Sequence, residues 1–198
     1  ALPFKFLLPP NPARLDAINP TQVMPGGAFK LTGVNLAPFY TVIFKQGDRF
    51  ADVPHHVLKF TEGTMIEGMV PGLLAGDAEV FVAYGNETTH VKSNSLPVKA
   101  LAPLPVELES ISSVEGKPEG VPGNTFKITG KNLAPFYDIV FKQGDKIVVI
   151  ESFDYKVVDG VIIGVIPELP SNPTQVFLTL GSNTPASVIL NFFIKPKP

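Results

Sequence analysis

The sequence contains no cysteine and few charged residues, and each shortage excludes a class of function. Among its 198 residues there is no Cys, which excludes disulfides, thiolate metal sites and a Cys nucleophile. Charged residues make up 17% of the chain, and the formal net charge is -2. Lys and Arg are scattered rather than clustered, so no basic surface is available for a phosphate backbone. We therefore expect no nucleic-acid partner.

Long apolar runs are also missing. No stretch approaches the ~18 consecutive apolar residues that indicate a membrane-spanning helix. Apolar segments such as 161–166 have the length of a strand instead. We therefore expect no membrane insertion.

Residues suited to catalysis or metal binding are sparse. His55, His56 and His90 all lie in the first half of the chain, and the second half has no His. Adjacent His55 and His56 would point to opposite faces of a strand, which is poor geometry for one metal ion. The sequence has no nucleophile elbow, zinc-protease motif or phosphate-binding Gly-rich loop. We predict that the protein is not an enzyme and uses no metal or cofactor.

Proline and glycine, in contrast, are abundant. The chain has 21 Pro and 17 Gly, and Pro interrupts nearly every stretch in which a helix would otherwise begin. Between these residues lie short runs rich in Val, Ile, Phe and Thr, the composition typical of strands. The sequence therefore predicts an all-β protein.

The chain contains two copies of one unit. FKLTGVNLAPFYTVIFKQGD at 29–48 aligns without gaps with FKITGKNLAPFYDIVFKQGD at 126–145, and 15 of the 20 positions are identical. A weaker match relates 65–85 to 161–181, with 7 of 21 positions identical. The repeat is about 95 residues long, the size of one small β-sandwich.

Local patterns in each copy predict strands and turns. Phe29 and Leu31 alternate with polar neighbours, as expected of a strand with one buried face. Gly33 and Gly130 follow a Thr and precede a short polar turn, where we expect a positive φ. The stretch Lys45-Gln-Gly-Asp48, which recurs in the second copy, indicates a hairpin loop with its Gly in the left-handed region.

The residues around the first of these strands resemble a known family. Ile18-Asn-Pro20, then Pro25-Gly-Gly27, then a strand ending in Thr32-Gly33 and followed by Asn35-Leu36, is similar to the opening of an IPT/TIG domain. The second copy matches this pattern less fully, from Pro122 onward. The resemblance implies an immunoglobulin-like β-sandwich. It also implies a setting in receptor stalks, bacterial surface proteins, polysaccharide-active proteins or transcription factors, the last of which requires basic loops that this chain lacks.

The predicted architecture is two tandem immunoglobulin-like β-sandwich domains. An extended arm at 1–14 precedes domain 1 at 15–99, and domain 2 spans 107–195. The joint at 100–106 has Pro at alternate positions, which predicts a short, stiff linker.

The stretch NLAPFY occurs in both copies, ending at Tyr40 and at Tyr137. In a structural interpretation, Phe39 or Phe136 fills the end of the sandwich and the tyrosine hydroxyl binds the backbone. In a functional interpretation, these four aromatic residues form exposed platforms that stack on sugar rings or anchor a protein partner. We favour the structural interpretation for the phenylalanines and leave the tyrosines open.

The N-terminal arm is a second candidate for partner binding. Phe4 and Phe6 share one face of this segment. The arm is either an added edge strand of its own first domain or a strand that pairs with the sheet edge of a neighbouring subunit. An unpaired apolar arm promotes aggregation, so we expect it to dock.

Duplication, stiff joints and missing catalytic residues together predict a non-catalytic structural and binding module of a surface assembly. We expect protein partners or self-assembly, at a bacterial cell surface or on a phage virion. The alternative is an accessory carbohydrate-binding module of a secreted or surface polysaccharide-active protein, which the paired Phe-Tyr residues favour.

Overall fold

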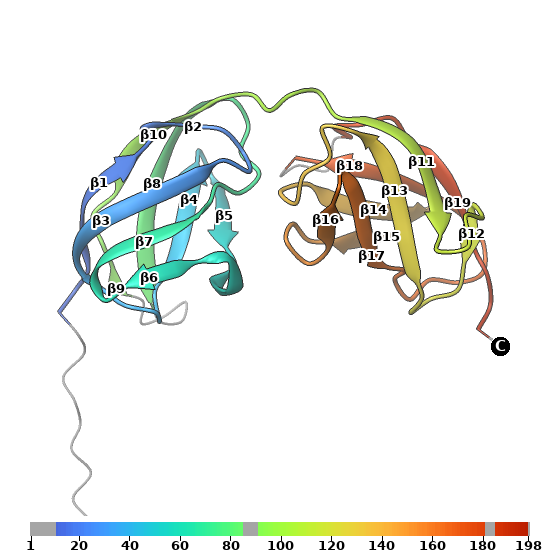
Figure 1. The fold of residues 1–198 in the computed structure, drawn as a ribbon, viewed down its shortest axis with the longest axis horizontal. Coiled ribbons are helices and arrows are strands. Elements are labelled where there is room, and N and C mark those ends of the chain that lie inside the picture. Colours follow the sequence, from blue (N-terminus) through green and yellow to red (C-terminus); the bar gives the residue numbers. More distant parts are fainter. Residues whose placement is uncertain (1–10, 85–90, 181–184, 198) are drawn as a thin grey trace, which may run out of the picture. The chain divides into compact units, whose positions relative to one another are not determined.

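The computed structural model describes residues 11–84, 91–180 and 185–197. The chain forms two compact units, and the main division between them falls between Leu101 and Ala102, inside the segment predicted as the linker. Each unit is a β-sandwich (Figure 1). The candidate residues Phe4 and Phe6 lie outside the described residues, so the role of the arm stays a prediction. No helix in the described ranges is long and apolar enough to cross a membrane.

The first unit packs a four-stranded sheet, in the order β1-β3-β7-β6, against a sheet in the order β2-β10-β8-β4-β5, with β9 added on β8. One short 3-10 helix, η1, follows β5. The elements are β1 Arg14–Asn19, β2 Gln22–Val23, β3 Ala28–Leu36, β4 Thr41–Gln46, β5 Arg49–Val53, η1 His55–Val57, β6 Lys59–Thr61, β7 Gly63–Met69, β8 Gly76–Tyr84, β9 Val91–Lys92 and β10 Leu96–Ala100.

The second unit repeats this arrangement. Its sheets have the orders β11-β13-β17-β16 and β12-β19-β18-β14-β15. The strands are β11 Glu107–Ser113, β12 Glu119–Gly120, β13 Thr125–Lys131, β14 Asp138–Gln143, β15 Lys146–Ile150, β16 Lys156–Val158, β17 Val161–Val165, β18 Pro173–Thr179 and β19 Leu190–Ile194.

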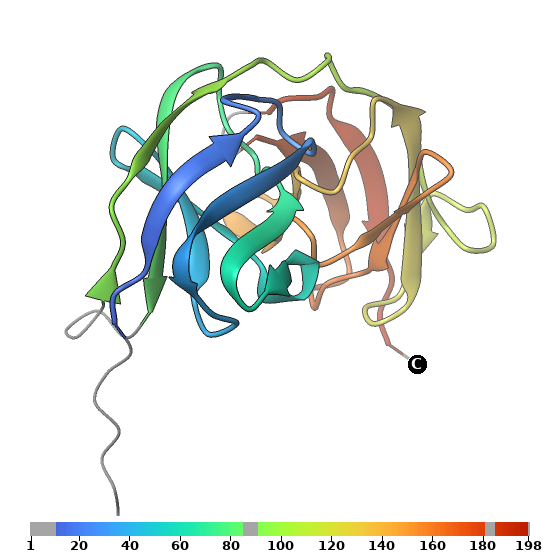
Figure 2. The ribbon, with the colours of Figure 1, turned by 60° about the vertical axis from the view of Figure 1, so that its left-hand side comes forward.

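The strand order identifies the fold. In the first unit the chain begins in one sheet, where β1 pairs antiparallel with β3, and continues in the other sheet, where β2 pairs parallel with β10. Both views show β1 and β3, in blue, side by side (Figures 1 and 2). This division of the first strand between the two sheets, together with the strand orders given above, is the topology of immunoglobulin-like sandwiches. The prediction of two tandem immunoglobulin-like domains is confirmed.

The core of each unit is centred on a phenylalanine pair that joins its two sheets. Phe29 of β3 meets Phe44 of β4 edge to face, with ring centroids 5.4 Å apart. Phe126 and Phe141 form the same contact in the second unit, also at 5.4 Å. All four rings are buried, as is Leu31, which confirms the predicted alternation. Burial of one such side chain stabilises the fold by roughly 1.5–3 kcal/mol.

The Thr-Gly pair serves a different purpose from the one predicted. Gly33 and Gly130 are absent from the described residues with positive φ, so that expectation was wrong. The register between β1 and β3 shifts beside Leu15, and a Cβ at Gly33 would lie 2.0 Å from the Arg14 carbonyl oxygen. In the second unit, a Cβ at Gly130 would likewise lie 2.0 Å from the Glu107 carbonyl oxygen. Glycine is needed here because a bulged strand passes too close for any side chain.

The left-handed residue follows two positions later, at an asparagine. Asn35 has a φ of 58° and Asn132 a φ of 57°. Asparagine tolerates this region, and the Asn132 side chain donates to the Pro105 carbonyl oxygen at 2.6 Å. The hairpin prediction is confirmed as well, because Gly47 and Gly144 have φ values of 61° and 57°.

We predict that Gly130→Ala destabilises the protein by about 2 kcal/mol or more, because the added methyl group displaces β11. Gly144→Asn is the matched control. Its position has a positive φ but open space around it, so the cost is at most ~1 kcal/mol. Urea unfolding of the full chain measures both. Equal losses in the two variants would contradict the role assigned to Gly130.

Candidate functional site

The two tyrosines of NLAPFY are structural. Tyr40 and Tyr137 are each only 1% exposed. The Tyr40 hydroxyl accepts a hydrogen bond from the Ala13 N–H at 3.2 Å, and the Tyr137 hydroxyl lies 3.5 Å from the Leu104 carbonyl oxygen. Each phenol therefore closes one end of a sandwich and satisfies backbone near its first strand. The hypothesis of exposed tyrosine platforms is corrected at both positions, because neither ring can reach a partner.

The phenylalanines differ between the copies. Phe136 is 6% exposed and fills the sandwich end as predicted, whereas Phe39 is 44% exposed. Phe39 packs on Tyr40 with ring centroids 4.8 Å apart, and its outer side is open. The corner-filling interpretation therefore holds for the second unit and fails for the first.

Phe39 has a partner that the sequence analysis did not identify. Tyr84, the last residue of β8, lies 4.9 Å from Phe39 between ring centroids, at an interplanar angle of 62°. Tyr84 is 45% exposed, whereas Leu180 at the aligned position of the second unit is 8% exposed. We call Phe39 and Tyr84 the aromatic platform. The available signal was an aromatic residue at the end of a strand where the other copy has leucine.

The aromatic platform rests on a rigid base. The buried Tyr40 ring lies beneath both members, 6.3 Å from Tyr84 between centroids. Pro38 directly precedes Phe39, and its own ring fixes the backbone φ at that position. Tyr84 is held by strand pairing to Val91 of β9. The two exposed rings therefore have little freedom to rearrange.

In the second unit the segment between β15 and β16 folds onto the turn. The Phe153 N–H donates to the Pro135 carbonyl oxygen at 2.8 Å. The Tyr155 hydroxyl lies 2.9 Å from the Ala134 carbonyl oxygen and 2.7 Å from that of Tyr137. Phe136 is thus bracketed by hydrogen bonds on both sides of the turn and is buried.

The corresponding segment of the first unit is the helix η1. Its His55 ring contacts the Pro38 carbonyl oxygen and packs 5.3 Å from the Phe60 ring, so Phe39 remains open. His55 and His56 lie in this helix rather than in a strand. His90 lies outside the described residues. Across the described ranges, no three His, Cys, Asp or Glu side chains gather in a way that would hold a metal ion.

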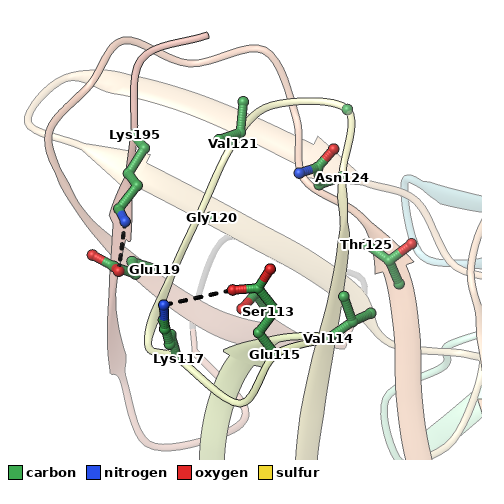
Figure 3. A pocket seen from close by; sticks show the side chains of 11 residues that line it. Ser113, Val114, Glu115, Lys117, Glu119, Gly120, Val121, Asn124, Thr125 and Lys195 are labelled. Atoms are coloured by element: carbon green, nitrogen blue, oxygen red, sulfur yellow. Dashed lines mark ion pairs between the residues drawn. The ribbon is translucent and has the colours of Figure 1, made fainter. Parts of the chain in front are cut away.

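A hollow of about 480 Å³ lies at one end of the second unit (Figure 3). The loop between β11 and β12, residues 114–118, borders it and is longer than the two-residue loop between β1 and β2. Glu115 pairs with Lys117 at 3.6 Å, and Glu119 pairs with Lys195 at 2.6 Å. These charges neutralise each other at the surface, and no aromatic ring borders the hollow. It offers a ligand less than the aromatic platform does.

Comparisons with known proteins establish no family for this chain. No family model matches the chain, and no curated protein matches it, so the IPT/TIG assignment stays a prediction. Among solved structures, the chain is similar to a Bacteroides ovatus mixed-linkage glucan utilization locus protein, SGBP-B, in complex with a mixed-linkage heptasaccharide. The identity is 15% over 96% of this chain and 47% of that chain, with a TM-score of 0.34.

Two further solved structures are similar to the chain at comparably low sequence identity. A surface glycan-binding protein of Prevotella bryantii, PbSGBP-B, is 16% identical over 87% of this chain and 40% of that chain, with a TM-score of 0.32. An I-band fragment of titin is 15% identical over 94% of this chain and 66% of that chain, with a TM-score of 0.26. The chain therefore spans less than half the length of the Bacteroides ovatus protein and of the Prevotella bryantii protein.

We predict that Tyr155→Phe destabilises the protein by about 1–2 kcal/mol at neutral pH, because the Ala134 and Tyr137 carbonyl oxygens lose the hydroxyl that donates to them. Burial, and then the nearby Asp138 carboxylate, raise the pKa of Tyr155. An unfolded tyrosine ionises near pH ~10. The wild-type stability is therefore fully present below that pH and falls as the pH rises above it, because only the unfolded chain readily releases the proton.

In Tyr155→Phe this alkaline loss of stability is smaller. Urea unfolding at neutral and alkaline pH measures both effects. The control is Tyr84→Phe, which removes the hydroxyl of an exposed tyrosine and is expected to leave stability unchanged. A Tyr155→Phe variant with wild-type stability at both pH values would contradict the assigned hydrogen bonds.

Proposed function

We propose that this protein is a non-catalytic binding module of a cell-surface assembly and that the aromatic platform of its first unit binds carbohydrate. The observation that carries the proposal is the exposure of Phe39 and Tyr84, in contact with each other, where the second unit has buried Phe136 and Leu180. Two large apolar rings left open by one copy and covered in the other indicate a surface kept for a ligand.

A sugar ring suits the size and chemistry of the aromatic platform. One face of a pyranose ring carries mainly C–H groups, which pack on the negative face of an aromatic ring. A stable protein interface buries about 800 Å² on each partner, far more than two half-exposed rings supply. The aromatic platform therefore matches one or two sugar units better than a protein surface.

A polar group near the aromatic platform is available to orient a sugar. His56 is exposed in η1, near the NLAPFY turn that His55 contacts. An imidazole group at the rim of an apolar surface supplies hydrogen bonds that fix a ligand's orientation.

The rigidity of the site favours binding. Phe39 and Tyr84 are already packed on Tyr40, so little side-chain entropy remains to be lost when a ligand stacks. The proposal includes no catalytic step, because the sequence has no catalytic motif. A polysaccharide ligand lies outside the cell, which favours the cell surface over the virion as the location. A second candidate function, protein contact, is favoured by the second unit and is developed below.

We predict that Tyr84→Ala and Phe39→Ala each weaken glycan binding about tenfold or more, because each removes half of the stacking surface. The full chain is first screened on a glycan array, and the affinity for the best ligand is then measured by calorimetry. Phe50→Ala is the matched control. Phe50 is also an exposed ring of the first unit. It lies on β5, where the Lys45 ammonium group of β4 packs over it, away from the aromatic platform.

The control is expected to bind like the wild type, and thermal unfolding checks that all variants are folded. Failure of the wild type to bind any glycan would sink the proposal. So would binding that is indifferent to both platform substitutions.

A further inference from the structure

One edge strand of the second unit exposes apolar side chains along its centre. β15 is the last strand of its sheet and pairs with β14 on one side, from Lys146 opposite Gln143 to Ile150 opposite Ile139. On its other side the described residues supply no strand. Ile147 is 51% exposed and Val149 is 43% exposed. Long, apolar, open edges are rare in soluble proteins because they recruit further strands.

The backbone of β15 is oriented to receive a strand. β14 and β15 are joined by a two-residue loop, Gly144-Asp145, and the residues that flank such a loop form a hydrogen-bonded pair. Backbone groups alternate in direction along a strand, so those of Ile147 and Val149 point away from β14. The two exposed side chains therefore belong to the residues whose N–H and C=O groups face the open edge.

The corresponding edge strand of the first unit carries a charged residue. β5 has the place in its sheet that β15 has in the second unit. Asp52 pairs with Ile43 as Val149 pairs with Val140, so the two positions correspond. A charge on an edge strand discourages pairing with another strand. The second unit has valine at the position where the first has a carboxylate.

We propose that β15 pairs with β15 of a second copy of this chain, antiparallel and about a two-fold axis through Val148. A two-fold axis perpendicular to a continuous sheet keeps each side chain on its own face, so one residue must lie opposite itself. With Val148 at the axis, Ile147 lies opposite Val149 twice. The outward backbone groups of both residues then form the new hydrogen bonds.

A second copy fits this edge because the strand complements itself. Each Ile147–Val149 pair places one exposed apolar side chain against another, the type of cross-strand pair that stabilises antiparallel sheets. At the rim, Asp145 of one copy lies opposite Glu151 of the other, which weakens the contact modestly. A strand pair alone buries less than the ~1,200 Å² of a standard interface, so the dimer forms at high protein concentration.

The absence of cysteine makes a direct test possible. In the proposed dimer the two Val148 residues form a non-hydrogen-bonded pair with Cα atoms about 4.5 Å apart, within reach of a disulfide. Val148→Cys is expected to form a disulfide-linked dimer at least about tenfold faster than Val114→Cys. Val114 is an exposed residue of the loop between β11 and β12 and serves as the control. Equal rates in non-reducing gels would overturn the pairing.

Association in solution provides the second test. The wild-type chain is examined by sedimentation velocity from about 10 µM to about 1 mM, where its mean mass is expected to rise towards that of a dimer. Val149→Asp introduces the residue of the first unit and is expected to keep the chain monomeric. Asp52→Val opens the edge of β5 and is expected to produce species larger than dimers.

The outcomes separate the alternatives. A wild-type chain that stays monomeric throughout, or association that Val149→Asp does not affect, would overturn the proposal. Loss of association in Val149→Asp without cross-linking of Val148→Cys would also overturn it, because another segment then occupies the edge. Circular dichroism confirms folding of each variant. Phe39→Ala leaves association unchanged, so this inference and the carbohydrate proposal fail independently.

Discussion

Each unit depends on an edge-to-face contact between two phenylalanine rings that joins its sheets. Phe29 and Phe44 make this contact in the first unit, and Phe126 and Phe141 make it in the second. β3 and β4 belong to opposite sheets and are joined by the NLAPFY turn, as are β13 and β14. The turn must therefore cross the end of the sandwich, and a buried tyrosine closes that end.

The close approach of the first strand is a second constraint. The first strand of each unit bulges near its start, before the chain continues in the other sheet. Only glycine fits beneath the bulge, at Gly33 and Gly130. The repeated letters around Thr-Gly and NLAPFY are thus explained by packing, and they say little about what the protein binds.

Function in this protein is better sought where the copies differ. Phe39 is open in the first unit, whereas the corresponding Phe136 is covered in the second. The reason is that the segment after β5 differs from the segment after β15. Tyr84 replaces leucine, and Val149 replaces aspartate, outside the stretch of highest identity. These differences place an aromatic platform on one unit and an apolar edge on the other. Duplication supplied two scaffolds, and divergence of a few surface positions distinguishes them.

The sequence by itself determined the fold class, the duplication, the alternation around Phe29 and the hairpin glycines, because strand periodicity and turn chemistry are local properties. It did not determine the environment of the aromatic residues. Whether Phe39 is open depends on η1, and whether Phe136 is buried depends on Tyr155, which lies 18 residues beyond Tyr137. The platform partner Tyr84 and the exposed edge of β15 likewise follow from strand order. Contacts between distant segments decided both, and only the tertiary structure contains them.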